Sequence, residues 1–375
     1  MFITIFTKYT HSQHHPMSLT LNSTPGHLYF LSEMDVLRNE RTPYIKIGIV
    51  KNERTSKERI FEHQTGNPRK IHLERELETP FVSNIETIIH HLYNQKRVAA
   101  EWFMLTPQEM DEVYTHAKEV SQRFQDRLSE FEQVQLAKDI VSTGEAAPTL
   151  SQETQDLYDR YKDAKLIMET TKAQKTLFIE QLKHRADGYA GIEDILVFRR
   201  KKGSERFDKP RFAEEHPDLY ASFLSTEEKV SASSIKVTGE ATAKHVDETL
   251  REDIKQAKAA NTSLTYDVDN PDNIKPRDNQ DEDLHLAYLE ADADYYEACM
   301  DLELLGIQLQ MIHIEHDHAT EITGMSTWKR TMTTSESFDK KTLAQEHPDL
   351  YMSYLNTSKE SVETRVFSEG RVYLA

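Results

Sequence analysis

The sequence predicts an α+β protein, in which a small domain of three antiparallel strands with flanking helices is followed by a long helix and a duplicated, helix-rich extension. Residues 44–50 alternate with a period of two, as a half-buried strand does. Apolar side chains between residues 85 and 92 instead recur at helical spacing. A motif that begins at Phe207 returns at Phe338. These observations indicate a mixed fold with an internal repeat.

Three segments of the first domain have the composition and alternation of β-strands. Residues 32–43, between the first two, are polar and end in a proline, so we expect a hairpin with a longish loop. The expected strands cover residues 27–31, 44–50 and 69–78, and residues 101–105 close the domain.

Two short helices are expected beside these strands. Ser56 has the side chain of an N-cap, and residues 57–63 follow it as a helix that the Thr-Gly-Asn-Pro run at 65–68 ends. The helix with apolar spacing described above is capped in this prediction by Ser83 or Asn84. We therefore expect both helices to pack on the sheet.

A long polar helix is expected over residues 107–140. Its apolar side chains form a narrow stripe, which suits a coiled-coil or bundle contact better than a broad core. We therefore expect this helix to connect the two halves of the chain and to offer a surface for a homo-oligomer. The stripe consists of Met110, Val113, Ala117, Val120 and Phe124.

The repeat has an offset of 131 residues, and most of the eighteen positions from Phe207 to Leu224 are identical in the second copy. Each copy follows a long amphipathic segment and precedes a β-prone one, so we expect long helix, strand, short helix, strand in each unit. The proline after His216 or His347 is expected to break the short helix. The apolar patch that follows each proline favours packing against the long helix.

Composition shifts suggest where the regions meet. Residues 141–151 have the Gly, Ala and Pro content of a linker, and the stretch rich in Asn, Asp and Pro before residue 283 is typical of a disordered tether. The expected regions are a disordered leader (1–26), the first domain (27–106), the connecting helix (107–140), a linker (141–151), repeat unit 1 (152–240), a polar helix with a disordered acidic tether (241–282) and repeat unit 2 (283–375).

Charge is distributed unevenly along the chain, whose formal net charge is −18. Residues 1–110 carry 13 Lys and Arg against 12 Asp and Glu, a net charge of +1. Residues 111–375 carry the remaining 33 against 52, a net charge of −19. The first domain can therefore approach a phosphate backbone even though the whole chain is acidic.

Cysteine content and hydropathy bound the environment. Cys299 is the single cysteine, which excludes an intrachain disulfide or a cysteine-based zinc site and fits a reducing cytoplasm. No run approaches the ~20 apolar residues that span a bilayer, so we expect no membrane contact. The histidine-rich residues 11–17 are typical of a leader, and either Met1 or Met17 is the native start.

One set of residues in the first domain matches a known family in order and spacing. Tyr29, the Lys46-Ile47-Gly48 run, Arg59 and Glu86 resemble the motifs of the GIY-YIG nucleases. The likeness is closest to the phage-associated branch, also called the meiotically up-regulated gene type, whose second motif is Lys-Ile-Gly. It covers residues 27–106. Further matching positions are His63, His90, Arg97 and Glu101-Trp102-Phe103.

The resemblance implies how a phosphodiester bond would be hydrolysed. Tyr29 would accept the proton of the attacking water, and Glu86 would bind one Mg²⁺ (or Mn²⁺) that keeps most of its waters. A phenol with a pKa near 10 needs nearby positive charge for this role, which Lys46 would supply. Arg59 would grip the phosphate, and His63 would orient or deprotonate the tyrosine. Further substrate contacts are expected from Arg69, Lys70 and Arg97.

The duplicated units resemble, over a short stretch, the accessory tail that follows the catalytic core of YqaJ-type phage exonucleases. Two interpretations stay open for them: a purely structural unit, or a docking or DNA-positioning module. Either leaves room for a protein partner at the repeats. The basic residues of the second interpretation are Arg199, Arg200, Lys201, Lys202, Arg206, Lys329 and Arg330.

Together these patterns predict a divalent-metal-dependent endonuclease that hydrolyses DNA, in a phage, a prophage or an anti-phage defence system. The acidic C-terminal repeats would serve targeting, assembly or regulation. The alternative is a catalytically inactive adaptor of the GIY-YIG fold that binds DNA or protein. A third interpretation is a nuclease whose acidic arms cover the active site as a DNA mimic.

Overall fold

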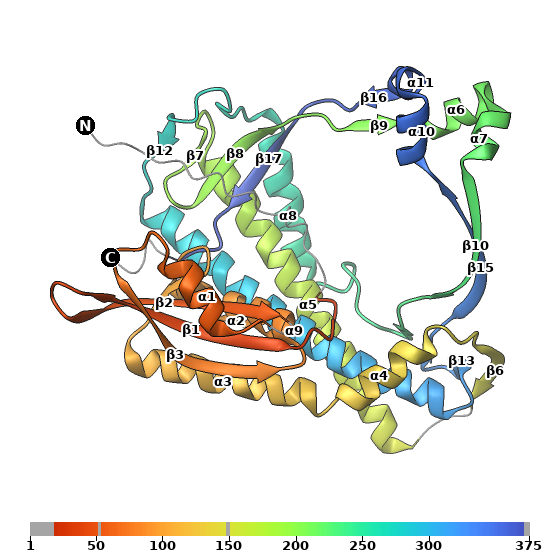
Figure 1. The fold of residues 1–375 in the computed structure, drawn as a ribbon, viewed down its shortest axis with the longest axis horizontal. Coiled ribbons are helices and arrows are strands. Elements are labelled where there is room, and N and C mark those ends of the chain that lie inside the picture. Colours follow the sequence, from red (N-terminus) through yellow and green to blue (C-terminus); the bar gives the residue numbers. More distant parts are fainter. Residues whose placement is uncertain (1–18, 52–53, 148–150, 371–375) are drawn as a thin grey trace.

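The computed structural model describes residues 19–51, 54–147 and 151–370, and its fold is α+β, as predicted. Figure 1 shows the N-terminal sheet beside two long helices, α5 (Gln152–Arg185) and α9 (Asn279–Glu315), from which β-ribbons reach to a separate group of short helices. Among the helices of these residues, none combines the length and the apolar character that crossing a bilayer requires.

The N-terminal sheet has five strands, where the sequence predicts three. Its order is β3-β1-β2-β5-β4, because the segment that was expected only to close the domain adds two short strands beside β2. The long loop expected over residues 32–43 is wrong as well, since β1 and β2 stay paired as far as Asp35 and Glu40. The strands are β1 (Gly26–Asp35), β2 (Glu40–Lys51), β3 (Lys70–Thr79), β4 (Arg97–Ala99) and β5 (Trp102–Met104).

Helix α1 (Ser56–Gln64) lies where the sequence predicts a helix, but its cap differs. Thr55 is the N-cap, and it forms a capping box with Glu58, each side chain bonding to the other's backbone N–H. Ser56, the expected cap, is the first helical residue. Its hydroxyl instead donates to Glu76 and so ties the start of the helix to β3.

Helix α2 (Val82–Leu92) packs its apolar face on the sheet and has no side-chain cap. Asn84, expected as a cap, is buried. Its side-chain amide hydrogen-bonds instead to the backbone of Thr20 and Asn22, which precede β1. Leu19 and Leu21 are themselves buried, so the end of the predicted leader belongs to this domain. Its residues 1–18 lie outside the described residues.

The connecting segment is two helices, α3 (Pro107–Gln125) and α4 (Leu128–Ala137), and not one continuous helix. The predicted apolar stripe is completely buried within the chain, in one core with the sheet, α2 and α9. The prediction that this stripe is a surface for a homo-oligomer is therefore wrong, because the chain itself buries the stripe. Phe124, for example, packs against Phe81 at a ring-centroid distance of 5.5 Å.

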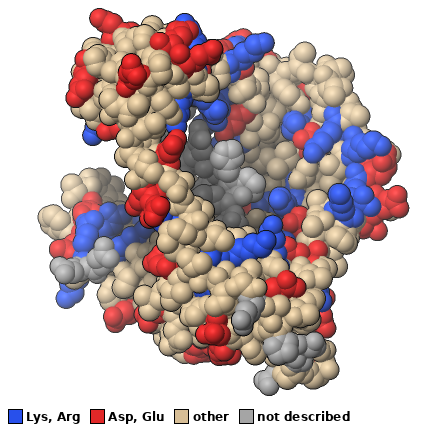
Figure 2. Space-filling view, turned by 90° about the vertical axis from the view of Figure 1, so that its right-hand side faces the viewer, with Lys and Arg blue, Asp and Glu red and all other residues tan. Residues whose placement is uncertain are grey.

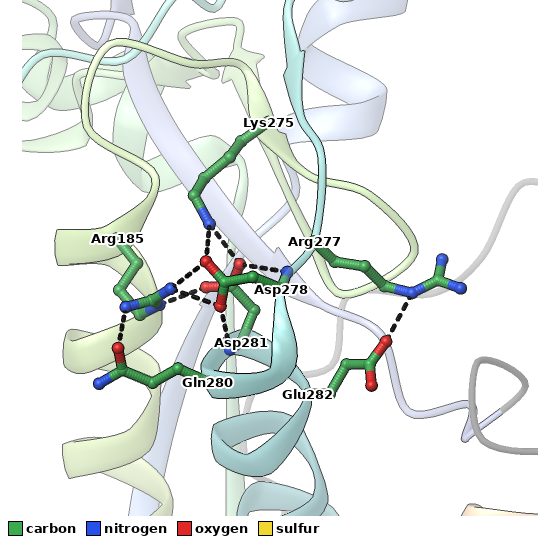
Figure 3. Close-up of polar contacts among 7 residues, drawn as sticks. All are labelled: Arg185, Lys275, Arg277, Asp278, Gln280, Asp281 and Glu282. Atoms are coloured by element: carbon green, nitrogen blue, oxygen red, sulfur yellow. Dashed lines mark hydrogen bonds and ion pairs between the residues drawn. The ribbon is translucent and has the colours of Figure 1, made fainter.

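The long helices α5 and α9 pack side by side and are locked at one end by a charged cluster (Figure 3). Asp278 caps α9 in a box with Asp281. Asp281 has no exposed surface, and its carboxylate pairs with Arg185 at the end of α5 and with Lys275. A buried carboxylate is stable only when it is paired in this way, so the cluster fixes the register of the two helices.

The two copies of the repeated motif pack against each other and form what we call the distal knob, residues 207–223 and 338–354. Each copy has two short helices, because Pro217 and Pro348 break the helix as predicted. The prediction that each copy packs against a long helix is wrong. The apolar residues of both copies, among them Phe212 and Leu343, instead share one small core. The helices are α6 (Lys209–Glu215), α7 (Pro217–Ser222), α10 (Lys340–Glu346) and α11 (Pro348–Ser353).

Two ribbons join the distal knob to the long helices, and each contains one strand segment from each repeat unit (Figure 1). In the first, Leu224 pairs with Phe338; in the second, Leu355 pairs with Phe207. The repeat offset of 131 exchanges these two pairs, so the units are related by an approximate two-fold arrangement. The first ribbon is β10 (Leu224–Ala232) with β15 (Arg330–Phe338); the second is β8 (Leu196–Lys201) and β9 (Glu205–Phe207) with β17 (Ser361–Val366) and β16 (Leu355–Thr357).

The predicted linker and the predicted disordered tether both have structure. In the linker, β6 (Thr143–Ala147) pairs with β13 (Ala319–Ile322), while residues 148–150 lie outside the described residues. In the tether, β12 (Ile274–Lys275) pairs with the strand at residues 191–192. Tyr266 stacks on Phe198 at 3.7 Å. The predicted disorder of the tether is therefore wrong, because ring stacking and backbone pairing hold this segment in place.

Candidate functional site

Tyr29 lies at the centre of the candidate site, on the face of the sheet that α1 covers. It pairs with Gly48 of β2 and has no exposed surface. The phenol lies directly over Gly48, where an added Cβ would stand 2.6 Å from the tyrosine Oη. The glycine of the Lys-Ile-Gly run is therefore required for space, since any side chain there would displace the tyrosine ring.

Helix α1 places two of the expected residues beside the tyrosine. His63 Nε2 lies 3.3 Å from Tyr29 Oη, within hydrogen-bond distance. Arg59, one turn earlier, is half-buried, and its Nη1 donates to the Glu62 carboxylate at 2.5 Å. Its Nε is buried without a partner among the described residues. The unsatisfied Nε is available to an acceptor that enters the site.

Lys46 occupies the same face of β2, two residues before Gly48. Its side chain is buried, and its ammonium pairs with the carboxylate of Glu101 and lies 5.8 Å from the centre of the Trp102 ring. Glu101 is one of the positions that match the family, but the resemblance implies no role for it. The structure makes it the partner of Lys46, and this is the functional candidate that sequence reasoning missed.

Glu86, on α2, completes the set that the structure brings together. Burial, and then the negative charge of Glu101, raise the pKa of Glu86 to about 7, against the opposing charges of Lys51, Lys46 and Arg97. Its carboxylate makes no hydrogen bond or ion pair with any residue in the described part of the chain. A carboxyl group in this state lacks the cation that would compensate its burial.

The pKa shifts of the tyrosine and the histidine set the resting protonation state of each side chain. Burial raises the pKa of Tyr29 to about 12, although the hydrogen bond and positive charge of Arg59 oppose this. Burial lowers the pKa of His63, and the charges of Lys46 and Arg59 lower it further. At neutral pH the phenol is therefore protonated and the imidazole neutral, and the proton rests on the phenol until another charge enters the site.

Among the described residues no group of three or more His, Cys, Asp or Glu side chains could hold a metal ion, so a divalent cation here would depend on one carboxylate. Mg²⁺ in phosphate-processing sites is held by one or two carboxylates with waters and substrate phosphate oxygens as the other ligands. Glu86 offers an oxygen ligand that no described residue occupies, whereas Glu101 is paired with Lys46. Glu86 is therefore the residue that could hold the ion.

The three expected substrate contacts are placed differently. Arg97 lies beside the cluster, where its positive charge lowers the pKa of Glu86, but it is enclosed and donates to the backbone of Ala100. Arg69 pairs with Glu33 at 2.9 Å, and Lys70 is exposed at the start of β3. No hydrogen bond or ion pair joins Arg69 or Lys70 to the catalytic candidates within the described residues.

The end of repeat unit 2 reaches this domain. Arg97 Nη1 donates to Ser368 Oγ at 3.4 Å, and the Gly370 N–H donates to the carbonyl oxygen of Asn94 at 3.0 Å. A side chain at Gly370 would meet the backbone of Gln95. The segment that follows β17 is thus fitted closely against the loop before β4, next to Arg97.

The cluster in this small α+β domain combines a phenol, an imidazole, two cations and a carboxylate that has no partner among the described residues. Residues 26–118 match the T5orf172 domain, a phage-associated nuclease-like domain. The match covers about a quarter of the chain. No curated protein and no solved structure matches the chain.

Proposed function

We propose that the T5orf172 domain of this chain is a GIY-YIG-type endonuclease that hydrolyses DNA phosphodiester bonds with Mg²⁺ or Mn²⁺. The observation that carries this proposal is the convergence of Tyr29, His63 and Lys46 on one face of the sheet with the Glu86 carboxylate, which the described residues leave unpartnered. Each supplies something that hydrolysis of a phosphodiester needs: a proton path, positive charge and an oxygen ligand for a metal ion.

In the proposed mechanism, Tyr29 Oη passes its proton to His63 Nε2 as it takes one from the attacking water. The water oxygen then forms the new bond to phosphorus, and the bond to the leaving sugar oxygen breaks; that oxygen takes a proton from solvent. Arg59 Nε, which has no partner in the described part of the chain, would donate to a phosphate oxygen. Lys46 adds positive charge that opposes the negative charge gathering on the phosphate.

A bound metal ion would supply further charge neutralisation on the phosphate oxygens. Glu86 would hold it, and the ion in turn would compensate the burial that raises the pKa of this carboxyl to about 7. The positive charge of Arg97 opposes this rise in the pKa of Glu86.

Plasmid cleavage tests this proposal. Wild type should nick or cut supercoiled plasmid with Mg²⁺ or Mn²⁺, and Glu86→Gln should reduce the rate roughly 100-fold or more. Glu78→Gln is the matched control, because Glu78 is an exposed glutamate of the same domain with no ion pair among the described residues. The proposal fails if wild type does not cut, or if Glu86→Gln cuts as fast as Glu78→Gln.

The same chain offers one observation in favour of a non-catalytic, DNA-binding adaptor. Tyr29 has no exposed surface, and burial raises its pKa to about 12, which makes it a poor base until substrate arrives. An adaptor would bind duplex DNA as tightly in Glu86→Gln as in wild type, and neither protein would cut it. The plasmid experiment therefore separates the two functions.

A further inference from the structure

The second ribbon, β8 and β9 with β16 and β17, carries an excess of positive charge that its counterpart lacks. Residues 196–207 and 355–366 contain seven Lys and Arg against three Glu. The segments related to them by the repeat offset, 327–338 and 224–235, contain three of each. The compared segments correspond residue by residue at the repeat offset, although the first ribbon is continuous and the second is interrupted at residues 202–204 and 358–360.

The basic ribbon is anchored at both ends, and its middle contacts the rest of the molecule through the ion pair of Arg200 with Asp269. At one end Leu196, Phe198 and Val366 belong to an apolar cluster at the long helices. At the other end Phe207 and Leu355 belong to the core of the distal knob. Strand β8 pairs on its other side with residues 191–192, but only at Leu196 and Val197; beyond these two residues no further strand of the described part of the chain borders the ribbon.

The basic side chains are exposed and mostly free of partners. Arg200 pairs with Asp269 and Glu360. Within the described part of the chain, the other exposed cations of the ribbon have no carboxylate within ion-pair distance. Successive side chains of a strand point to opposite faces, so these cations are presented on both sides of the ribbon. They are Arg199, Lys201, Lys202, Arg206 and Lys359.

A simpler role for these cations would be to keep exposed strand edges from pairing with other chains. The counterpart ribbon argues against this as the whole explanation. Its edges are equally exposed, yet Ser, Thr and three glutamates suffice there, with Lys229 as the exposed lysine of the paired strands. Edge protection therefore does not require seven cations. Unpaired, exposed Lys and Arg in an acidic chain are instead suited to a polyanion.

We propose that the basic ribbon is a second DNA-binding element, which grips the phosphate backbone of duplex DNA outside the catalytic site. Two-stranded ribbons bind duplex DNA in other proteins, where cations to phosphates set position and not sequence. Figure 2 shows the counterpart ribbon crossing in front of a hollow, with Lys and Arg side chains at several places on its rim. The inference rests on the proposed function in taking DNA as the ligand.

The ribbon also has a route to the catalytic domain. Strand β17 continues directly into the residues that contact Arg97 and Asn94. DNA held on the ribbon is therefore held by the same segment that packs beside the Glu86 cluster. This distinguishes the ribbon from a flexible tail, whose binding would be independent of the position of the catalytic domain.

The test uses the full chain carrying Glu86→Gln, without divalent metal, and a fluorescent duplex of about three helical turns. Lys201→Ala with Lys202→Ala removes two unpaired cations of the basic ribbon. Lys229→Ala with Lys236→Ala is the matched control, which removes two exposed, unpaired lysines elsewhere in repeat unit 1. Affinity is measured by fluorescence anisotropy over a range of salt concentrations, and circular dichroism checks that both variants fold.

The first pair should lower the slope of log affinity against log salt by about 1.8, because each lost phosphate contact contributes about 0.9. The control pair should leave the slope unchanged. Equal slopes for both pairs would overturn the proposal. It would also be overturned if duplex RNA bound more tightly than duplex DNA and its binding depended on Lys201 and Lys202 to the same extent. Failure of wild type to cut plasmid would refute the proposed nuclease function but would leave this binding result intact.

Discussion

The ammonium of Lys46 is paired with the carboxylate of Glu101, and this contact joins the second strand of the sheet to the turn before β5. Glu101 also acts on its neighbours through its charge, which raises the pKa of both Tyr29 and Glu86. A residue that partners one catalytic candidate and opposes the ionisation of two others sets the charge balance of the site.

Replacing Glu101 should destabilise the domain, because it leaves the buried ammonium of Lys46 without its partner. We expect Glu101→Gln to lower the free energy of unfolding by about 1–3 kcal/mol, measured by urea denaturation. Lys46→Met should remove most of that effect in a double-mutant cycle. Effects of the two changes that simply add would show that the pair does not interact energetically.

A methyl group at Gly48 should disable the site although no catalytic candidate is itself replaced. The added Cβ would stand 2.6 Å from Tyr29 Oη, so the ring must move. We expect Gly48→Ala to slow plasmid cutting by roughly 100-fold and to cost about 1–3 kcal/mol of stability. Gly144→Ala is the control, since nothing lies within 4 Å of a Cβ there. Unchanged cutting by Gly48→Ala would contradict this placement of Tyr29.

Metal affinity should depend on pH through Glu86. The pKa of this carboxyl is raised to about 7, so the neutral acid dominates below pH 7 and the carboxylate above it. A cation needs the carboxylate, and Mn²⁺ affinity should therefore fall about tenfold for each pH unit below 7 and level off above it. Calorimetric titration at pH 6, 7 and 8 measures this. Glu86→Gln should show weak binding at every pH; a pH-independent affinity in wild type would refute the assignment.

The distal knob offers a pair of equivalent aromatic residues with different burial. Tyr354 is 4% exposed and packs on Phe212, whereas Phe223, its counterpart at the repeat offset, is half-buried. Tyr354→Ala should cost about 3 kcal/mol of local stability and Phe223→Ala about half of that. Hydrogen exchange of the amides of α6 and α10 measures both. Equal protection in the two variants would contradict the asymmetric packing.

Local patterns in the sequence predicted the local structure well. The alternation in residues 44–50 marks β2, the spacing from Ile85 marks α2, and the prolines at 217 and 348 divide the knob helices. The motif residues also converge, since Tyr29 and His63 are brought to hydrogen-bond distance. Each of these features depends on residues that are close in sequence or on one simple hairpin.

Features that depend on distant pairing could not be predicted in the same way. The pairing of Phe207 in repeat unit 1 with Leu355 in repeat unit 2 leaves no local signal, because the sequence of a strand does not show which strand it pairs with. The ordered path of Tyr266 depends on a ring 68 positions away. Glu101 was visible as part of a motif, but its pairing with Lys46 requires the register of β5 on β2.

Single-turnover cleavage by Tyr29→Phe tests the central claim most directly. The change removes only the hydroxyl that lies 3.3 Å from His63 Nε2, and it keeps the ring that fills the space over Gly48. We predict that Tyr29→Phe binds duplex DNA as wild type does but cleaves it with Mn²⁺ roughly 100-fold or more slowly. A cleavage rate within twofold of wild type would contradict the account, because the phenol would then have no part in the proton transfer.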